Sequence, residues 1–141
     1  MKKLFLFLVC CLGVAACTSD EPSYYYYSDT AGASYTYQSN TPAPLSGVLS
    51  GNPSYNQAES IFFNACTKAR WTIVNKGGNV IKINFNNKGY NFDALIKFNQ
   101  NQYTIQFERA NQYKGNLKNA YAVYKKYADK LNRTIQKYSA T

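Results

Sequence analysis

The sequence contains no histidine among its 141 residues. Histidine is the commonest metal ligand and a frequent general base near neutral pH, so the chain cannot form a Ser-His or Cys-His nucleophile pair. Cysteine and acidic residues are also scarce, with 4 Cys and 7 Asp or Glu, and their spacing fits neither a zinc site nor a calcium-binding loop. We therefore expect no bound metal, no cofactor, no catalytic residues and no enzymatic activity.

Apolar runs long enough to span a membrane are missing too. A membrane-spanning helix needs about twenty apolar residues. The longest apolar run, residues 4–14, has eleven residues. Two lysines, Lys2 and Lys3, precede it, and the small residues Ala15 and Ala16 follow it. A positive start, a short apolar core and small residues at the end are typical of an export signal. The sequence therefore predicts a signal peptide over residues 1–16.

The end of this segment, Val14-Ala15-Ala16-Cys17, resembles the lipobox of bacterial lipoproteins. The resemblance implies cleavage before Cys17, a diacylglycerol thioether on its sulfur, and an acyl chain such as palmitate on the new amino group. Lipid chains of this kind hold a protein to a membrane, since two already give stable anchoring. The alternative is an ordinary secretory signal that is cut at the same small residues.

The residue after the lipidation site bears on location. Thr18 stands there, whereas an aspartate at that position marks inner-membrane retention in enteric lipoproteins. The resemblance therefore implies a lipid-anchored protein of the bacterial cell envelope, with the membrane as its partner through Cys17. If the cell is Gram-negative, we expect the outer membrane, facing the periplasm or the cell surface.

Residues 17–52 are rich in Ser, Thr, Gly, Pro and Tyr, and they follow neither a helical nor a strand period. This composition predicts a lipidated, disordered tether. The tether holds three acidic residues and no basic one. Its tyrosines, including Tyr24 to Tyr27, either form a sticky patch for sugars, bases or a protein, or reflect a bias toward Tyr in the whole chain.

Residues 53–141 are expected to form one small α+β domain. Its only cysteine is Cys66, because the three others lie at or before the lipidation site. No intrachain disulfide is then possible in the processed protein. Cys66 shares the apolar stripe of its segment, which predicts a buried thiol that acts as a small hydrophobe.

Hydrophobic periodicity gives the order of elements in this domain. Ser54 and Gln57 have the spacing of a capping box at the start of a helix, and Asn116 begins a second helix with apolar residues at intervals of three and four. Between them, period-two alternation and turn residues predict strands near 71–74, 80–86, 90–98 and 103–108. The expected fold is a two-layer α+β sandwich: a four-stranded antiparallel meander covered on one face by an N-terminal and a C-terminal helix.

Three features of this domain carry a second resemblance. They are Trp71-Thr72-Ile73, the strand Tyr103-Thr104-Ile105-Gln106-Phe107, and a tyrosine-bearing last helix with Leu131 and Ile135. Together they look like a group of small bacterial lipoproteins of uncharacterised function, over about residues 60–138. The resemblance implies a fold and a location, and it implies no chemistry.

The domain is strongly basic, with fourteen Lys or Arg from residue 68 onward. Such a domain at a bacterial surface attracts anionic neighbours, including lipopolysaccharide and phospholipid headgroups. The last helix gathers six of these cations on the side opposite its apolar stripe, and they are the candidate anion-binding residues: Lys118, Lys125, Lys126, Lys130, Arg133 and Lys137. The alternative is a solvated helix face without a ligand. No motif for specific nucleic-acid recognition is present.

A second constellation lies on the predicted polar face of the sheet. Tight turns would place Lys82 opposite Asp93, and Asp93 opposite Glu108, so that two carboxylates stand side by side. Such a pair is found in retaining glycosidases, although a flat, solvated sheet face offers no substrate cleft. We therefore predict a non-enzymatic interaction module for an envelope component. The alternatives are an envelope hydrolase that uses Asp93 and Glu108, and an assembly or inhibitor protein that binds one protein partner.

Overall fold

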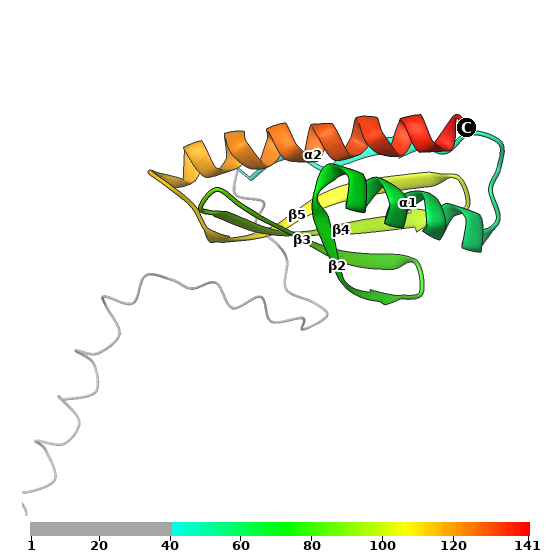
Figure 1. Cartoon of the computed structure of the whole chain (residues 1–141), viewed down its shortest axis with the longest axis horizontal. Coiled ribbons are helices and arrows are strands. Elements are labelled where there is room, and N and C mark those ends of the chain that lie inside the picture. Colours follow the sequence, from blue (N-terminus) through cyan, green and yellow to red (C-terminus); the bar gives the residue numbers. More distant parts are fainter. Residues whose placement is uncertain (1–40) are drawn as a thin grey trace, which may run out of the picture. The chain divides into compact units, whose positions relative to one another are not determined.

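Five antiparallel strands form one sheet in the part of the chain that the computed structural model describes, residues 41–141. The predicted signal peptide, Cys17 and most of the predicted tether lie outside the described residues. The strands stand in the order β1-β5-β4-β3-β2, and both helices cover the same face of the sheet (Figure 1). The elements are β1 (Leu45–Val48), α1 (Tyr55–Ala69), β2 (Trp71–Gly77), β3 (Val80–Asn87), β4 (Tyr90–Asn99), β5 (Gln102–Gln112) and α2 (Leu117–Ser139).

This arrangement confirms the α+β class, with two helices over an antiparallel sheet. The predicted number of strands is wrong, because the described sheet has a fifth strand, β1, in the stretch expected to be tether. β1 pairs with the outer edge of β5, with Leu45 opposite Ile105. Leu49, directly after β1, is 1% exposed. The segment is therefore held by backbone pairing with β5 and by one buried leucine, and neither contact is visible as a local pattern.

Both helices begin where the sequence predicts. The Ser54 side chain accepts from the Gln57 backbone N–H, and the Gln57 side chain accepts from the Ser54 backbone N–H, which completes the capping box. At the start of α2, the Asn116 side chain accepts from Asn119 N at 2.9 Å. These caps satisfy backbone donors that have no partner within the helix.

The core lies between the helices and the sheet, and it is strongly aromatic. Trp71 and Phe107 both meet the ring of Tyr124 edge to face, with centroids 6.2 and 4.8 Å apart. Cys66 is fully buried among these side chains, as predicted, and burial raises the pKa of its thiol from 9.0 to about 12. Packing of this kind stabilises a domain that has no disulfide among its described residues.

Strand β2 runs further than expected. The turn between β2 and β3 lies at Gly78 and Asn79, after a strand that ends at Gly77. Gly78 has a φ of 55°, a conformation that glycine adopts without steric cost. Lys76 falls between the predicted strands 71–74 and 80–86, but it lies within β2, where its ammonium forms an ion pair with Glu59 of α1.

Candidate functional site

The six predicted anion-binding residues lie along α2. All six side chains are exposed: Lys118, Lys125, Lys126, Lys130, Arg133 and Lys137. We call this set the basic face. Figure 1 shows α2 lying over one face of the sheet. The residues of α2 that are buried against the sheet include Tyr124 and Leu131, so the exposed basic face lies on the solvent side of the helix. The 3.6-residue repeat of α2 produces this separation, because residues three and four apart fall on one side of a helix.

Most of the cations on the basic face have no carboxylate partner in residues 41–141. Residues 41–141 contain four carboxylates and fourteen Lys or Arg, and every one of the four carboxylates already has a basic partner. The ion pairs are Glu59 with Lys76, Glu108 with Lys82, Asp93 with Arg109, and Asp129 with Lys125. Within the described residues, Lys125 is the single member of the basic face that has a carboxylate partner.

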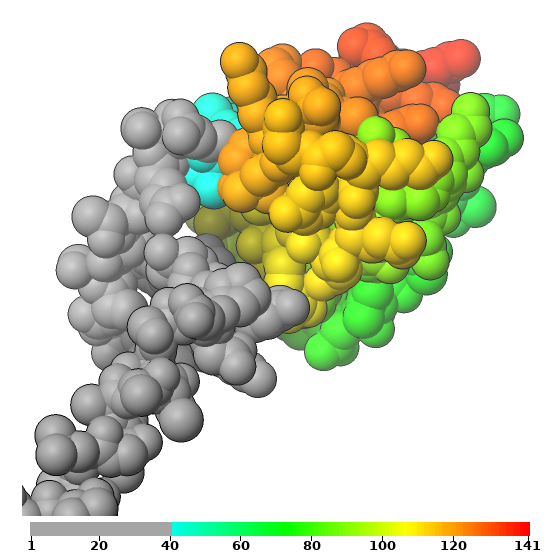
Figure 2. All heavy atoms as spheres, turned by 90° about the vertical axis from the view of Figure 1, so that its left-hand side faces the viewer, coloured from blue at the N-terminus to red at the C-terminus, as the bar shows by residue number. Residues whose placement is uncertain are grey.

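The basic face is long and narrow. Lys118 and Lys137 are separated by roughly 28 Å along the helix, at about 1.5 Å per residue. Lys126, Lys130 and Arg133 follow one another at intervals of four and three residues, so their charges lie on one stripe. Lys126 also lies over the ring of Tyr127, with its Nζ 5.9 Å from the ring centroid. A row of cations on a convex helix suits an extended or planar anionic partner better than a small molecule. Figure 2 shows the end of the domain from which this row starts, with the β5–α2 connection in yellow and the start of α2 in orange.

The face of the sheet that points away from α1 and α2 holds the second predicted constellation, and its predicted register is wrong. Lys82 lies opposite Leu95, and Asp93 lies opposite Asn84 on β3 and Arg109 on β5. The register of β4 and β5 shifts between Asp93 and Ala94. This bulge inserts Glu108 as an extra residue in β5 and brings Arg109, which the sequence analysis left out, to the position opposite Asp93.

Asp93 is held by a polar network. Its carboxylate accepts from Asn84 Nδ2 at 2.7 Å and from Arg109 Nη2 at 2.9 Å. Burial is the strongest influence on its pKa and acts to raise it, but hydrogen bonds from Asn84, Asn111 and Arg109, with the charge of Lys82, outweigh it. The pKa of Asp93 therefore lies below its usual value, which keeps the carboxylate ionised at neutral pH.

Glu108 is the other carboxylate of the proposed hydrolase pair. Its Oε2 lies 3.2 Å from Lys82 Nζ, so each of the two carboxylates faces its own cation. The lowered pKa of Asp93 suits an ionised carboxylate and not the general acid of a retaining glycosidase, which needs a raised pKa. Asp93 is only 5% exposed, and each carboxylate is neutralised by a cation, so the arrangement needs no catalytic role to explain it.

Sequence reasoning found part of this network. Period-two alternation over the predicted strands 80–86 and 90–98 puts Asn84 and Asn91 on the same face of the sheet as Asp93. Asn91 accepts from Asn84 Nδ2 at 2.7 Å and from Asn111 Nδ2 at 2.9 Å. Arg109 and Asn111 were missed, because they reach this face through two bulges in β5 that alternation does not predict.

No group of three or more His, Cys, Asp or Glu side chains is placed to hold a metal ion in residues 41–141. Neither α1 nor α2, the two helices of that range, combines the length and the apolar character of a membrane-crossing helix. No protein-family model, curated protein or solved structure matches the chain.

Proposed function

We propose that this chain is a bacterial envelope lipoprotein, anchored through Cys17, whose domain is a non-enzymatic module that binds an anionic envelope component through the basic face of α2. The observation that carries the proposal is the complete pairing of acidic residues. All four carboxylates of residues 41–141 have a basic partner, so ten cations in this range lack one. Half of these ten lie on the basic face.

The position of these cations suits an anionic surface or polymer. Phosphate groups of lipopolysaccharide or of phospholipid headgroups are spaced along a surface, as the basic face is along α2. Each Lys or Arg close to an anionic surface contributes about 1 kcal/mol. A lipid anchor on Cys17 would hold the domain next to such a surface at a high local concentration. The lipid anchor and the basic face would then strengthen each other's binding to the membrane, because either contact raises the local concentration for the other.

Charge reversal tests this proposal. The variant Lys126→Glu, Lys130→Glu and Arg133→Glu removes three cations from one stripe of α2. The matched control, Lys68→Glu, Lys88→Glu and Lys97→Glu, makes the same change of net charge at exposed residues elsewhere. None of these six has a carboxylate partner in residues 41–141, and exposed substitutions of this kind change stability by under about 0.5 kcal/mol each.

The measurement is co-sedimentation of residues 18–141 with lipopolysaccharide or with phosphatidylglycerol vesicles over a range of salt concentrations. We expect the stripe variant to bind about 100-fold more weakly at low salt, from three contacts of about 1 kcal/mol, and the control to bind far better. Binding by the wild type should fall steeply with salt, because exposed charges are screened. Equal losses in both variants, or no binding by the wild type at low salt, would contradict the proposal.

A further inference from the structure

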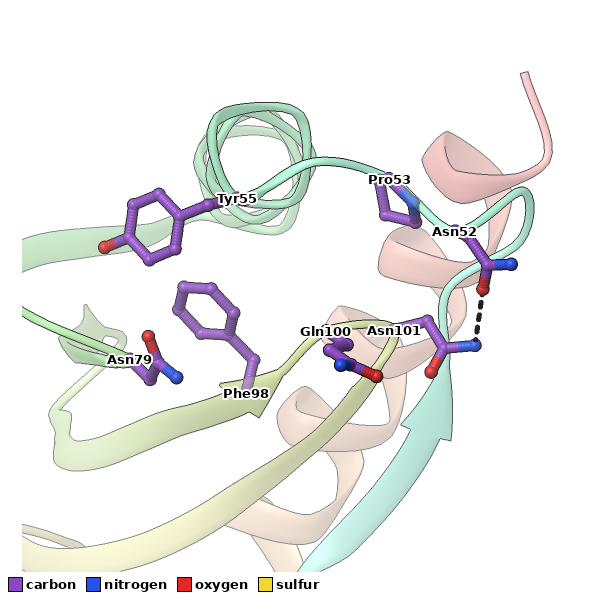
Figure 3. Close-up of a pocket in the computed structure, with 7 residues that line it drawn as sticks. All are labelled: Asn52, Pro53, Tyr55, Asn79, Phe98, Gln100 and Asn101. Carbon is purple, nitrogen blue, oxygen red and sulfur yellow. Dashed lines mark hydrogen bonds between the residues drawn. The ribbon is translucent and has the colours of Figure 1, made fainter.

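A surface hollow of about 450 Å³ lies at the end of the sheet where three connections meet (Figure 3). The β1–α1 connection, the β2–β3 turn and the β4–β5 turn all contribute side chains to it. We call it the amide hollow, and its lining residues are Asn52, Pro53, Tyr55, Asn79, Phe98, Gln100 and Asn101. Its volume falls within the range of roughly 300–1,000 Å³ that is typical of small-molecule sites.

The chemistry of the amide hollow differs from that of the rest of the domain. Four of its seven lining residues carry a side-chain amide, two are aromatic, and none is charged. A side-chain amide both donates and accepts hydrogen bonds, so it can donate to a ligand hydroxyl group or accept from one. A charged ligand would find no opposite charge in the lining. A neutral ligand with many hydroxyl groups would find donors, acceptors and two apolar rings.

Two of the amides have unused hydrogen-bonding capacity. Within residues 41–141, no hydrogen bond to the side chain of Asn79 or Gln100 is formed, and Figure 3 shows these two amides on either side of the Phe98 ring. By contrast, Asn101 Nδ2 donates to Asn52 Oδ1 at 3.1 Å. That bond joins the β4–β5 turn to the β1–α1 connection and fixes one rim of the hollow.

The aromatic wall is held in place before any ligand arrives. The Tyr55 ring lies 5.4 Å from the Phe98 ring, centroid to centroid, and its hydroxyl donates to the carbonyl of Gly78. Tyr55 is nevertheless 46% exposed. A fixed, exposed ring loses little conformational entropy on binding, and its apolar face can pack against the C–H face of a sugar.

The backbone of the rim is also unusual. Asn52 and Gln100 have φ values of 46° and 53°, in the left-handed region that glycine occupies more easily than residues with a Cβ atom. Asn tolerates this conformation through its short polar side chain, but Gln has no such advantage. The two-residue turn between β4 and β5 requires a positive φ at this position, as the turn at Lys88 does with a φ of 54°, and at residue 100 it brings a glutamine amide to the hollow.

We propose that the amide hollow binds a neutral saccharide of one or two sugar rings, with Asn79 and Gln100 bonding its hydroxyl groups and Tyr55 packing against a ring. The inference does not depend on the proposed function, because no residue of the basic face lines the hollow. The two sites differ in ligand charge, so one can fail while the other stands.

The test uses the full-length chain, labelled with nitrogen-15 and held in a detergent without a sugar headgroup. The probes are neutral oligosaccharides of glucose, galactose, mannose and N-acetylglucosamine, added one at a time. We expect at least one of them to shift the side-chain amide signals of Asn79 and Gln100 in a saturable way. No shift with any of these sugars, or shifts confined to other parts of the domain, would overturn the proposal.

Three variants sharpen the result. Gln100→Gly removes the side-chain amide, and glycine adopts the positive φ of this position easily, so the fold should survive the change. Asn79→Ala removes the second free amide. Each should weaken binding about three- to tenfold, as expected from the loss of one neutral hydrogen bond. Asn64→Ala, at an exposed position of α1 away from the hollow, is the control and should bind as the wild type does. Equal affinity in all three variants would also overturn the proposal.

Discussion

Tyr103 lies so close to Gly47 that a Cβ atom at residue 47 would fall 2.3 Å from the Tyr103 hydroxyl oxygen. That hydroxyl donates to Asn132 Oδ1 and accepts from Gln136 Nε2, both at 2.6 Å. A tyrosine of β5 therefore passes the backbone of β1 and reaches two amides of α2. The absence of a side chain at position 47 is what lets β1, β5 and α2 meet at this point.

Substitution of this glycine should loosen the edge of the sheet. Gly47→Ala forces the Tyr103 ring to shift, although the ring is 2% exposed and is held by two hydrogen bonds. We expect a loss of about 1–3 kcal/mol in the free energy of unfolding, as for other overpacked sites. Urea denaturation measures it, with the exposed neighbour Ser46→Ala as the control. An unchanged midpoint for Gly47→Ala would show that the ring moves without cost.

The pairing of β1 with β5 is a part of the fold that the sequence does not predict, whereas both helices are predictable from it. The capping box of Ser54 and Gln57 and the periodicity of α2 are local signals, so both helices were predicted correctly. β1 was not predicted, because four residues gain a strand conformation only from pairing with β5, which lies more than fifty residues away. A non-local contact of this kind leaves no periodic trace.

The candidate sites follow the same division. The basic face was predicted because helix geometry alone decides which residues of α2 share a side. The partners of Asp93 were not, because the bulge at Glu108 changes the register of β5. The amide hollow was missed entirely, since its residues come from three connections and from the ends of α1 and β4, which are distant in the sequence.

The Cys66 thiol should react slowly in the native protein. It is fully buried and its pKa is raised to about 12, so very little of the reactive thiolate is present at pH 8. We expect a thiol reagent to modify the denatured protein far faster than the native one. Equal rates in urea and in buffer would show that α1 opens readily.

Cys66 also predicts a change of stability with pH. Its folded pKa lies above the value of 9.0 for a free thiol, so the native state keeps its proton while the unfolded state loses it. The contribution of the neutral thiol is complete below about pH 9 and is lost as pH rises from there toward 12. The difference in unfolding free energy between wild type and Cys66→Ala should therefore shrink between pH 8 and pH 10.5, as measured by urea denaturation. A constant difference would contradict the raised pKa.

Asp93 predicts the opposite behaviour in acid. Its folded pKa is lowered below 3.8 by hydrogen bonds and nearby cations that outweigh burial, so its ionised form stabilises the fold. That contribution is present above the pKa of the unfolded state and is lost as pH falls through the folded pKa. We expect Asp93→Asn to lower the free energy of unfolding at pH 7, as measured by urea denaturation, and this loss should shrink progressively as pH falls below about 3.8. A loss that does not change with pH would contradict the lowered pKa of Asp93.

The partner of Asp93 can be tested directly. Arg109→Ala removes one hydrogen-bond donor and one positive charge, and it should raise the pKa of Asp93, as read from the carboxyl carbon signal in a nuclear magnetic resonance titration. Lys68→Ala, which removes an exposed cation of α1, is the control and should leave the pKa of Asp93 unchanged. If the pKa of Asp93 stays the same in Arg109→Ala, then Asn84 and Asn111 hold the carboxylate without the arginine.

The lipid anchor is the prediction on which the location of the protein rests. Cys17 is outside the described residues, and its assignment depends on the Val14-Ala15-Ala16-Cys17 sequence. Metabolic labelling with palmitate should mark the wild type and the control Cys66→Ala, but not Cys17→Ser. The unlabelled variant should also leave the membrane fraction, because the lipid chains supply the anchoring energy. A labelled Cys17→Ser protein would disprove lipidation at this residue, and an unlabelled but cleaved wild type would indicate an ordinary secretory signal.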